Sequence, residues 1–109
     1  MATANDLRKL ALALEGATEV GHFGSPSFRV GGRIFAQMSD KKKEAILKLS
    51  PAHQELLFEV RPEAFSPEIW GNIRWTRAML GEIPLDELKV LVREAYDQVA
   101  KAPKRKTKR

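Results

Sequence analysis

A Gly-Gly pair at residues 31–32 is the feature that most constrains how this chain can fold. It separates two short runs, 27–30 and 33–39, that are rich in aromatic and β-branched residues. Glycine readily adopts the positive φ angles that a two-residue hairpin turn requires, and strand-forming runs on both sides of such a pair are typical of a tight β-hairpin. The sequence therefore predicts two antiparallel strands over 27–30 and 33–39.

A two-residue turn also predicts which residues face each other across this hairpin, because the register follows from the loop length. Each face of the hairpin is then mixed in character. One face covers a core, and the other presents arginine beside apolar surface. The predicted pairs are Val30–Arg33, Arg29–Ile34, Phe28–Phe35 and Ser27–Ala36.

Apolar periodicity and capping residues predict three helices. Thr3 and Asp6 resemble a capping box before a run of leucines at helical spacing, which predicts a helix over about 4–15. Ser50-Pro51 begins a second helix, which ends at Arg61-Pro62 because the residue before proline avoids helical geometry. A third helix begins at Pro84, and its broad apolar stripe indicates packing against a core.

The segments between the helices give a weaker signal. Residues 17–26 are expected to be extended or looped, and Asp40–Lys43 is a second turn candidate that projects three lysines. Residues 44–49 alternate in character, which favours a third strand, although 40–49 also allows a helix. Residues 61–75 show no clear periodicity, and Trp75–Leu80 alternates again and predicts a strand.

The positive charge is concentrated at the C-terminal end. Six of the nine residues 101–109 are Lys or Arg. The rest of the chain contains 13 basic and 14 acidic residues, so its net charge is −1. Such a run of like charges buries no apolar surface, so we expect residues 102–109 to form a disordered basic tail. Its lysines and arginines are suited to contact with nucleic-acid phosphates, and the alternative is a solubilising end or a cloning remnant.

Composition limits the function classes. A length of 109 residues fits one domain, expected over 1–101, and the absence of cysteine excludes disulfides and zinc–thiolate sites. No run of 18 apolar residues is present, and the N-terminus lacks the layout of a signal peptide, so we expect a cytoplasmic protein without membrane contact. His22 and His53 lack metal-ligand spacing, and no phosphate-binding loop, nucleophile elbow or dinucleotide fingerprint is present. We therefore expect no cofactor, no metal and no enzymatic activity. The sequence does not determine the oligomeric state, and we expect a monomer.

Two blocks of the sequence resemble the MmcQ/YjbR-like family. The first is the hairpin block 24–36, and the second consists of 61–65 with 70–76, while the end of the last helix, 94–100, is also similar. The resemblance spans about residues 5–101. It implies an α+β fold of CyaY-like (frataxin-like) topology, with an antiparallel sheet packed against the N- and C-terminal helices. The family is described as a double-wing DNA-binding module, and this label is an argument by analogy. The acid-rich helix expected of an iron-binding frataxin is absent, which argues against iron delivery.

The sequence thus predicts a small α+β domain that binds DNA weakly, mainly through the phosphate backbone, from hairpins and a basic tail. Arginine grips phosphate in bidentate fashion, and indole rings can stack on bases. The alternative is a non-enzymatic protein- or small-ligand-interaction module that uses an aromatic surface over residues 65–75. The candidate nucleic-acid-binding residues are Arg29, Arg33, Lys41, Lys42, Lys43, Arg74, Arg77, Lys104, Arg105 and Lys106.

Overall fold

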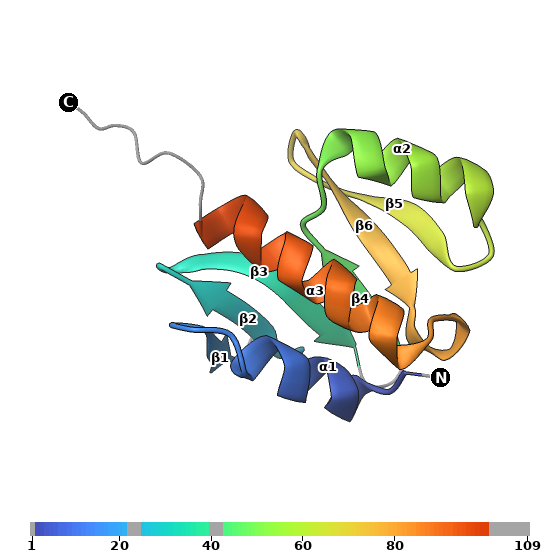
Figure 1. Ribbon diagram of the computed structural model, residues 1–109. Coiled ribbons are helices and arrows are strands. Elements are labelled where there is room, and N and C mark those ends of the chain that lie inside the picture. The colour runs from blue at the N-terminus through green and yellow to red at the C-terminus, as the bar shows by residue number, and fades with distance from the viewer. Residues whose placement is uncertain (1, 22–24, 40–42, 101–109) are drawn as a thin grey trace.

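The computed structural model describes residues 2–21, 25–39 and 43–100, which form a six-stranded antiparallel sheet with helices on one face (Figure 1). The sheet order is β1-β2-β3-β4-β6-β5. The strands are β1 (Thr18–Val20), β2 (Ser27–Val30), β3 (Arg33–Ser39), β4 (Glu44–Leu47), β5 (Phe65–Trp70) and β6 (Ile73–Met79). The helices are α1 (Ala4–Leu12), α2 (Pro51–Val60) and α3 (Leu85–Ala100), with a 3-10 turn, η1, at Leu80–Glu82. The predicted α+β fold is confirmed.

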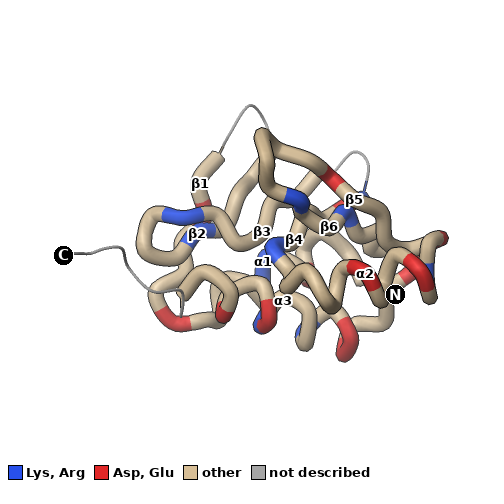
Figure 2. The backbone as a smooth tube through the Cα atoms, turned by 90° about the horizontal axis from the view of Figure 1, so that it is seen from above, with Lys and Arg blue, Asp and Glu red and all other residues tan. Residues whose placement is uncertain are grey.

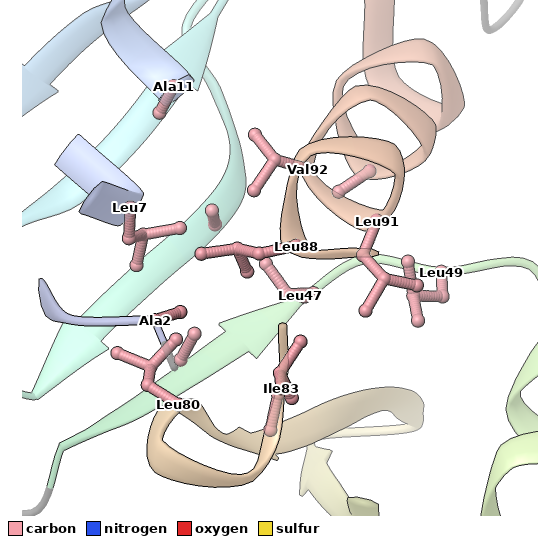
Figure 3. Packing of buried hydrophobic residues seen from close by; sticks show 14 of the residues in the cluster. Ala2, Leu7, Ala11, Leu47, Leu49, Leu80, Ile83, Leu88, Leu91 and Val92 are labelled. Carbon is pink, nitrogen blue, oxygen red and sulfur yellow. The ribbon is translucent and has the colours of Figure 1, made fainter. Parts of the chain in front are cut away.

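The core lies between the sheet and the helical layer. Figures 1 and 2 both place the three helices on the same side of the sheet, with α1 and α3 over its middle and α2 beside β5. Leu7 of α1, Leu47 of β4 and Leu88 of α3 are each fully buried and converge in this layer (Figure 3). Among the described residues, no helix covers the other face of the sheet, which leaves that face available to contribute to a site.

The β2–β3 hairpin is present as predicted, but its register differs. Gly31 and Gly32 have φ angles of +60° and +81°, the conformation that the two-residue turn requires. A β-bulge then shifts the register, so that Phe28 faces Ala36 and not Phe35, and Ser27 faces Gln37 and not Ala36. The other two predicted pairs, Val30–Arg33 and Arg29–Ile34, are confirmed.

The bulge has a packing cause. It leaves Phe35 as the extra residue of β3, so that Phe35 and its neighbour Ala36 are both fully buried. The Phe35 ring packs edge-on against Tyr96 of α3, with ring centroids 5.6 Å apart. A regular strand would turn one of these two neighbours away from the helices.

A second tight hairpin joins β5 to β6 through Gly71 and Asn72, with Trp70 facing Ile73. Gly71 has a φ of +64°, a positive angle like those of the two glycines in the first hairpin turn. The sequence pattern predicted no element where β5 forms, and the strand predicted over 75–80 in fact spans Ile73–Met79. Pro67 obscured β5, yet β5 is an edge of the described sheet, where a residue without an N–H is tolerated.

The helix caps follow the sequence more closely than the helix lengths do. Thr3 and Asp6 form the predicted capping box, with backbone-to-side-chain bonds of 2.9 and 3.1 Å. The helix predicted over 4–15 ends at Leu12, because the next turn tightens and the chain then reverses at Gly16, where φ is +78°. Ser50 caps α2 by accepting a bond from the His53 amide at 3.3 Å.

The remaining segments were only partly specified by the sequence. Residues 44–49, for which a strand and a helix were both open, contain the strand β4, and residues 17–26 contain β1. The tail predicted to be disordered, 102–109, lies outside the described residues. Within the described part of the chain, no helix is long and apolar enough to cross a membrane.

Candidate nucleic-acid interface

The two glycine-containing turns lie at the same end of the sheet. β4 runs antiparallel to both β3 and β6, so β3 and β6 run in the same direction and each begins directly after its turn. The last turn of α3 lies between the two hairpin tips (Figure 1). The chain also leaves β4 at this end and crosses to α2, which places Lys48 between the two hairpins.

A groove of about 520 Å³ opens between the hairpin tips. We call it the tip groove. Three of its described lining residues are cationic and none of them is a carboxylate. The described lining is Arg29, Gly32, Arg33, Ile34, Lys48, Ile73, Trp75, Gln98 and Val99. A neighbouring hollow of about 470 Å³ shares Lys48, Ile73 and Gln98 with it and adds Arg74.

The three cations of the tip groove form no ion pair with a carboxylate among the described residues. Arg29 donates from Nε to Ser27 Oγ at 3.3 Å, which orients its guanidinium without neutralising it. The ammonium of Lys48 lies 5.5 Å from the centre of the Trp75 ring, a cation–π geometry. Figure 2 shows basic segments in the β2–β3 hairpin, whereas the helical layer carries both signs of charge. The groove is therefore a site of uncompensated positive charge.

Trp75 forms part of the groove wall and is only 7% exposed. Its ring packs against Trp70, with centroids 4.7 Å apart and planes inclined at 44°. The indole Nε1–H of Trp75 is buried and has no acceptor among the described residues, whereas Nε1 of Trp70 donates to Glu68 at 3.1 Å. A residue of the groove wall thus carries a buried donor that the described part of the chain does not satisfy.

The structure separates two predicted arginines from the groove cations. Arg74 faces α2, where it donates to Gln54 at 3.1 Å and to Glu55 at 2.9 Å. Arg77 bonds to Glu68 and has Glu44 at 3.9 Å. Both guanidinium groups are therefore engaged by carboxylates, so they contribute less to the positive potential than Arg29 and Arg33 do.

The predicted lysines are placed differently again. Lys43 lies before β4, at the opposite end of β3 from Arg33, so the two are separated by about 20 Å at the usual strand rise. Lys41, Lys42, Lys104, Arg105 and Lys106 lie outside the described residues. Of the candidate residues that the structure describes, Arg29 and Arg33 share the tip groove, while Lys48 belongs to the groove and was missed. Its only sequence signal was its place in the alternating segment 44–49.

The predicted aromatic surface over 65–75 is not formed as expected. Phe65 is 2% exposed and belongs to the core, where the Arg61 guanidinium lies 5.3 Å from its ring. The large side chains that are exposed in this hairpin are Ile69, at 62%, and Ile73, at 44%. Phe65 faces the helices because its register partner is the buried Ala78.

Other charged groups serve the scaffold. Arg61 joins the end of α2 to Glu87 of α3 at 2.6 Å, and this hydrogen bond raises the pKa of Arg61 above its usual value. His53 bonds to Glu94 at 2.6 Å and links the start of α2 to α3. Among the described residues, no group of three or more histidines and carboxylates is arranged to hold a metal ion.

The chain is similar to known proteins over most of its length. A family model described as YjbR matches residues 12–98, which include both hairpins and the tip groove cations. The crystal structure of Deinococcus radiodurans protein DR2400, which has a DUF419 family-model domain, is similar at 27% sequence identity with a TM-score of 0.82. That similarity covers 93% of this chain and 80% of the other. No curated protein matches the chain.

Proposed function

The chain belongs to the YjbR family, and on this basis and the charge of the tip groove we propose that it binds DNA through the phosphate backbone. The observation that carries the proposal is the presence of three cations, Arg29, Arg33 and Lys48, in one groove whose described lining residues include no carboxylate. Lysine and arginine that meet phosphates release condensed counterions, and this term supplies binding whatever the base sequence.

The placement of the cations supports contact with the DNA backbone. Arg29 and Arg33 are fixed by a tight hairpin, and Lys48 follows β4 immediately. The sheet fixes the backbone that carries these cations, and the planar fork of arginine matches two phosphate oxygens. Three contacts make a small electrostatic footprint, so we expect weak binding that the basic residues 104–106 strengthen without base specificity.

A binding role without catalysis is part of the proposal. Among the described residues that line the tip groove and the hollow that shares Lys48 with it, there is no histidine, carboxylate or cysteine, and the carboxylate of Glu15 lines a separate hollow that also includes Arg33. Histidine, carboxylates and cysteine are the usual general bases and nucleophiles of enzyme sites.

The test is a salt titration of duplex binding, followed by fluorescence anisotropy between about 50 and 200 mM salt. Each lost phosphate contact lowers the slope of log affinity against log salt by about 0.9. We therefore expect Arg33→Ala and Lys48→Ala each to flatten the slope by about this amount, and deletion of residues 102–109 to flatten it further.

The matched control is Arg93→Ala, which removes a cation from α3 that is paired with Asp97 at 3.3 Å and lies outside the groove lining. We expect it to leave the slope unchanged. Absence of binding at the lowest salt, salt-independent binding, or an equal effect of Arg93→Ala would each contradict backbone binding at the groove.

A further inference from the structure

The tip groove has a second property that backbone contact does not use, because much of its wall is apolar. Ile34, Ile73 and Val99 contribute side chains beside the three cations, and Ile73 is 44% exposed. A phosphate group gains nothing from isoleucine, whereas binding sites for small organic ligands combine apolar walls with a few converging polar groups. The lining therefore indicates a ligand with an apolar face as well as a negative charge.

The indole of Trp75 is a second feature of the groove wall, because its buried N–H has no acceptor among the described residues. Buried polar groups in proteins almost always have a partner, but Nε1 of Trp75 is not exposed to the groove, so an acceptor atom of a ligand reaches it only if the indole ring shifts. Trp70, which packs against Trp75, has its own N–H satisfied by Glu68 at 3.1 Å. Thr76 Oγ1 and Arg77 Nε are also buried without a partner among the described residues, so Trp75 differs from them only because it lines the groove.

The three cations, the apolar wall and the Trp75 indole together match the chemistry of one nucleotide. A nucleobase has a flat apolar face and acceptor atoms on its edge, and its phosphate carries the negative charge that Arg29, Arg33 and Lys48 attract. The volume of about 520 Å³ lies within the usual range for small-ligand sites, about 300–1,000 Å³. In a duplex the bases are stacked and paired, so only the backbone reaches the cations.

We propose that the tip groove receives one unstacked nucleotide, with the base against Ile34, Ile73 and Trp75 and the phosphate at the arginines. This rests on the proposed function and names its preferred substrate, a single strand over a duplex. A free mononucleotide offers the same chemistry, and the experiment separates the two sources.

The experiment follows intrinsic fluorescence in the full chain. The sequence has two tryptophans, and Trp70→Phe leaves Trp75 as the reporter. The probes are a single-stranded oligothymidylate, a duplex of the same length, thymidine monophosphate and inorganic phosphate, all at one salt concentration. We expect the single strand to quench Trp75 and to bind about tenfold more tightly than the duplex, as contact with one base allows.

The wall is tested with Ile73→Ala and the control Ile69→Ala in the same hairpin, because Ile69 is 62% exposed and is not part of the groove lining. We expect Ile73→Ala to weaken single-strand binding about fivefold with duplex binding unchanged, and Ile69→Ala to change neither. Quenching by thymidine monophosphate would show that one free nucleotide is sufficient for binding in the groove. Quenching by the single strand alone would show that the nucleotide must be part of a polymer.

The outcomes separate the inference from the function on which it rests. Salt-dependent duplex binding without tighter single-strand binding would overturn the nucleotide site and leave backbone binding intact. Equal quenching by inorganic phosphate would also overturn it, because no base is then required. A chain that binds neither nucleic acid would overturn both proposals.

Discussion

Gln54 lies beside the tip groove, in the neighbouring hollow, and the contribution of its hydrogen bonds to stability can be tested directly. This side chain of α2 is only 2% exposed. Its Nε2 donates to the carbonyls of Leu49 at 2.8 Å and Arg74 at 3.0 Å, and its Oε1 accepts from Arg74 Nε at 3.1 Å. One residue thus connects α2 to the segment after β4 and to the first residues of β6. These two segments flank the groove.

Gln54→Met removes these three hydrogen bonds and nearly preserves the shape of the side chain. At about 1 kcal/mol for each buried bond, the loss is about 3 kcal/mol, of which burial of the thioether recovers roughly 1 kcal/mol. We therefore expect the free energy of unfolding to fall by about 2 kcal/mol, which leaves a domain of ordinary stability folded.

Equilibrium unfolding in urea measures this quantity by linear extrapolation. The control is Gln37→Met in β3, since Gln37 makes no side-chain hydrogen bond to any described residue. A loss below about 0.5 kcal/mol, or one equal to that of the control, would refute the reasoning, because it would mean that water replaces the amide at no cost.

Two further substitutions test the core and the first hairpin. Leu88→Ala opens a cavity at a fully buried position of α3 and should lower the free energy of unfolding in urea by about 2–5 kcal/mol. The control Val90→Ala, at a position that is 64% exposed, should lower it far less. Similar losses for the two variants would contradict the placement of the core. Gly32→Ala should cost about 1 kcal/mol, because φ is +81° although no atom lies within 4 Å of the added Cβ. Gly81→Ala adds a methyl group into equally open space without a positive φ, so an equal loss in thermal unfolding would show that backbone strain is not the cause.

Local signals in the sequence were sufficient for much of the fold. The Gly31-Gly32 turn, the Thr3 capping box and the Ser50-Pro51 start of α2 are short-range patterns, and all three are present. The errors arose where tertiary contacts decide. The bulge buries Phe35 against Tyr96 of α3, a residue far away in the sequence, so the hairpin residues alone do not predict it.

The candidate site was less predictable for the same reason. Arg33, Lys48 and Trp75 come together only through the pairing of β4 with β3 and β6, so no sequence spacing indicates that they share a groove. Arg77 was a reasonable candidate by residue type, but its carboxylate partners Glu44 and Glu68 come from neighbouring strands. Charge was predictable from the sequence, and whether a charge is neutralised was not.

The pairing of β4 with β6 joins residues 44–47 to residues 76–79 across the intervening α2 and β5. Each glycine hairpin can form early from nearby residues, but this junction must wait for closure of a much longer loop, which is the slow kind of step in folding. Nascent or damaged molecules that retain both hairpins but have not joined them possess no groove. If the groove binds a nucleotide as we propose, binding requires the completed sheet, and the bound ligand should stabilise the pairing of β4 with β6.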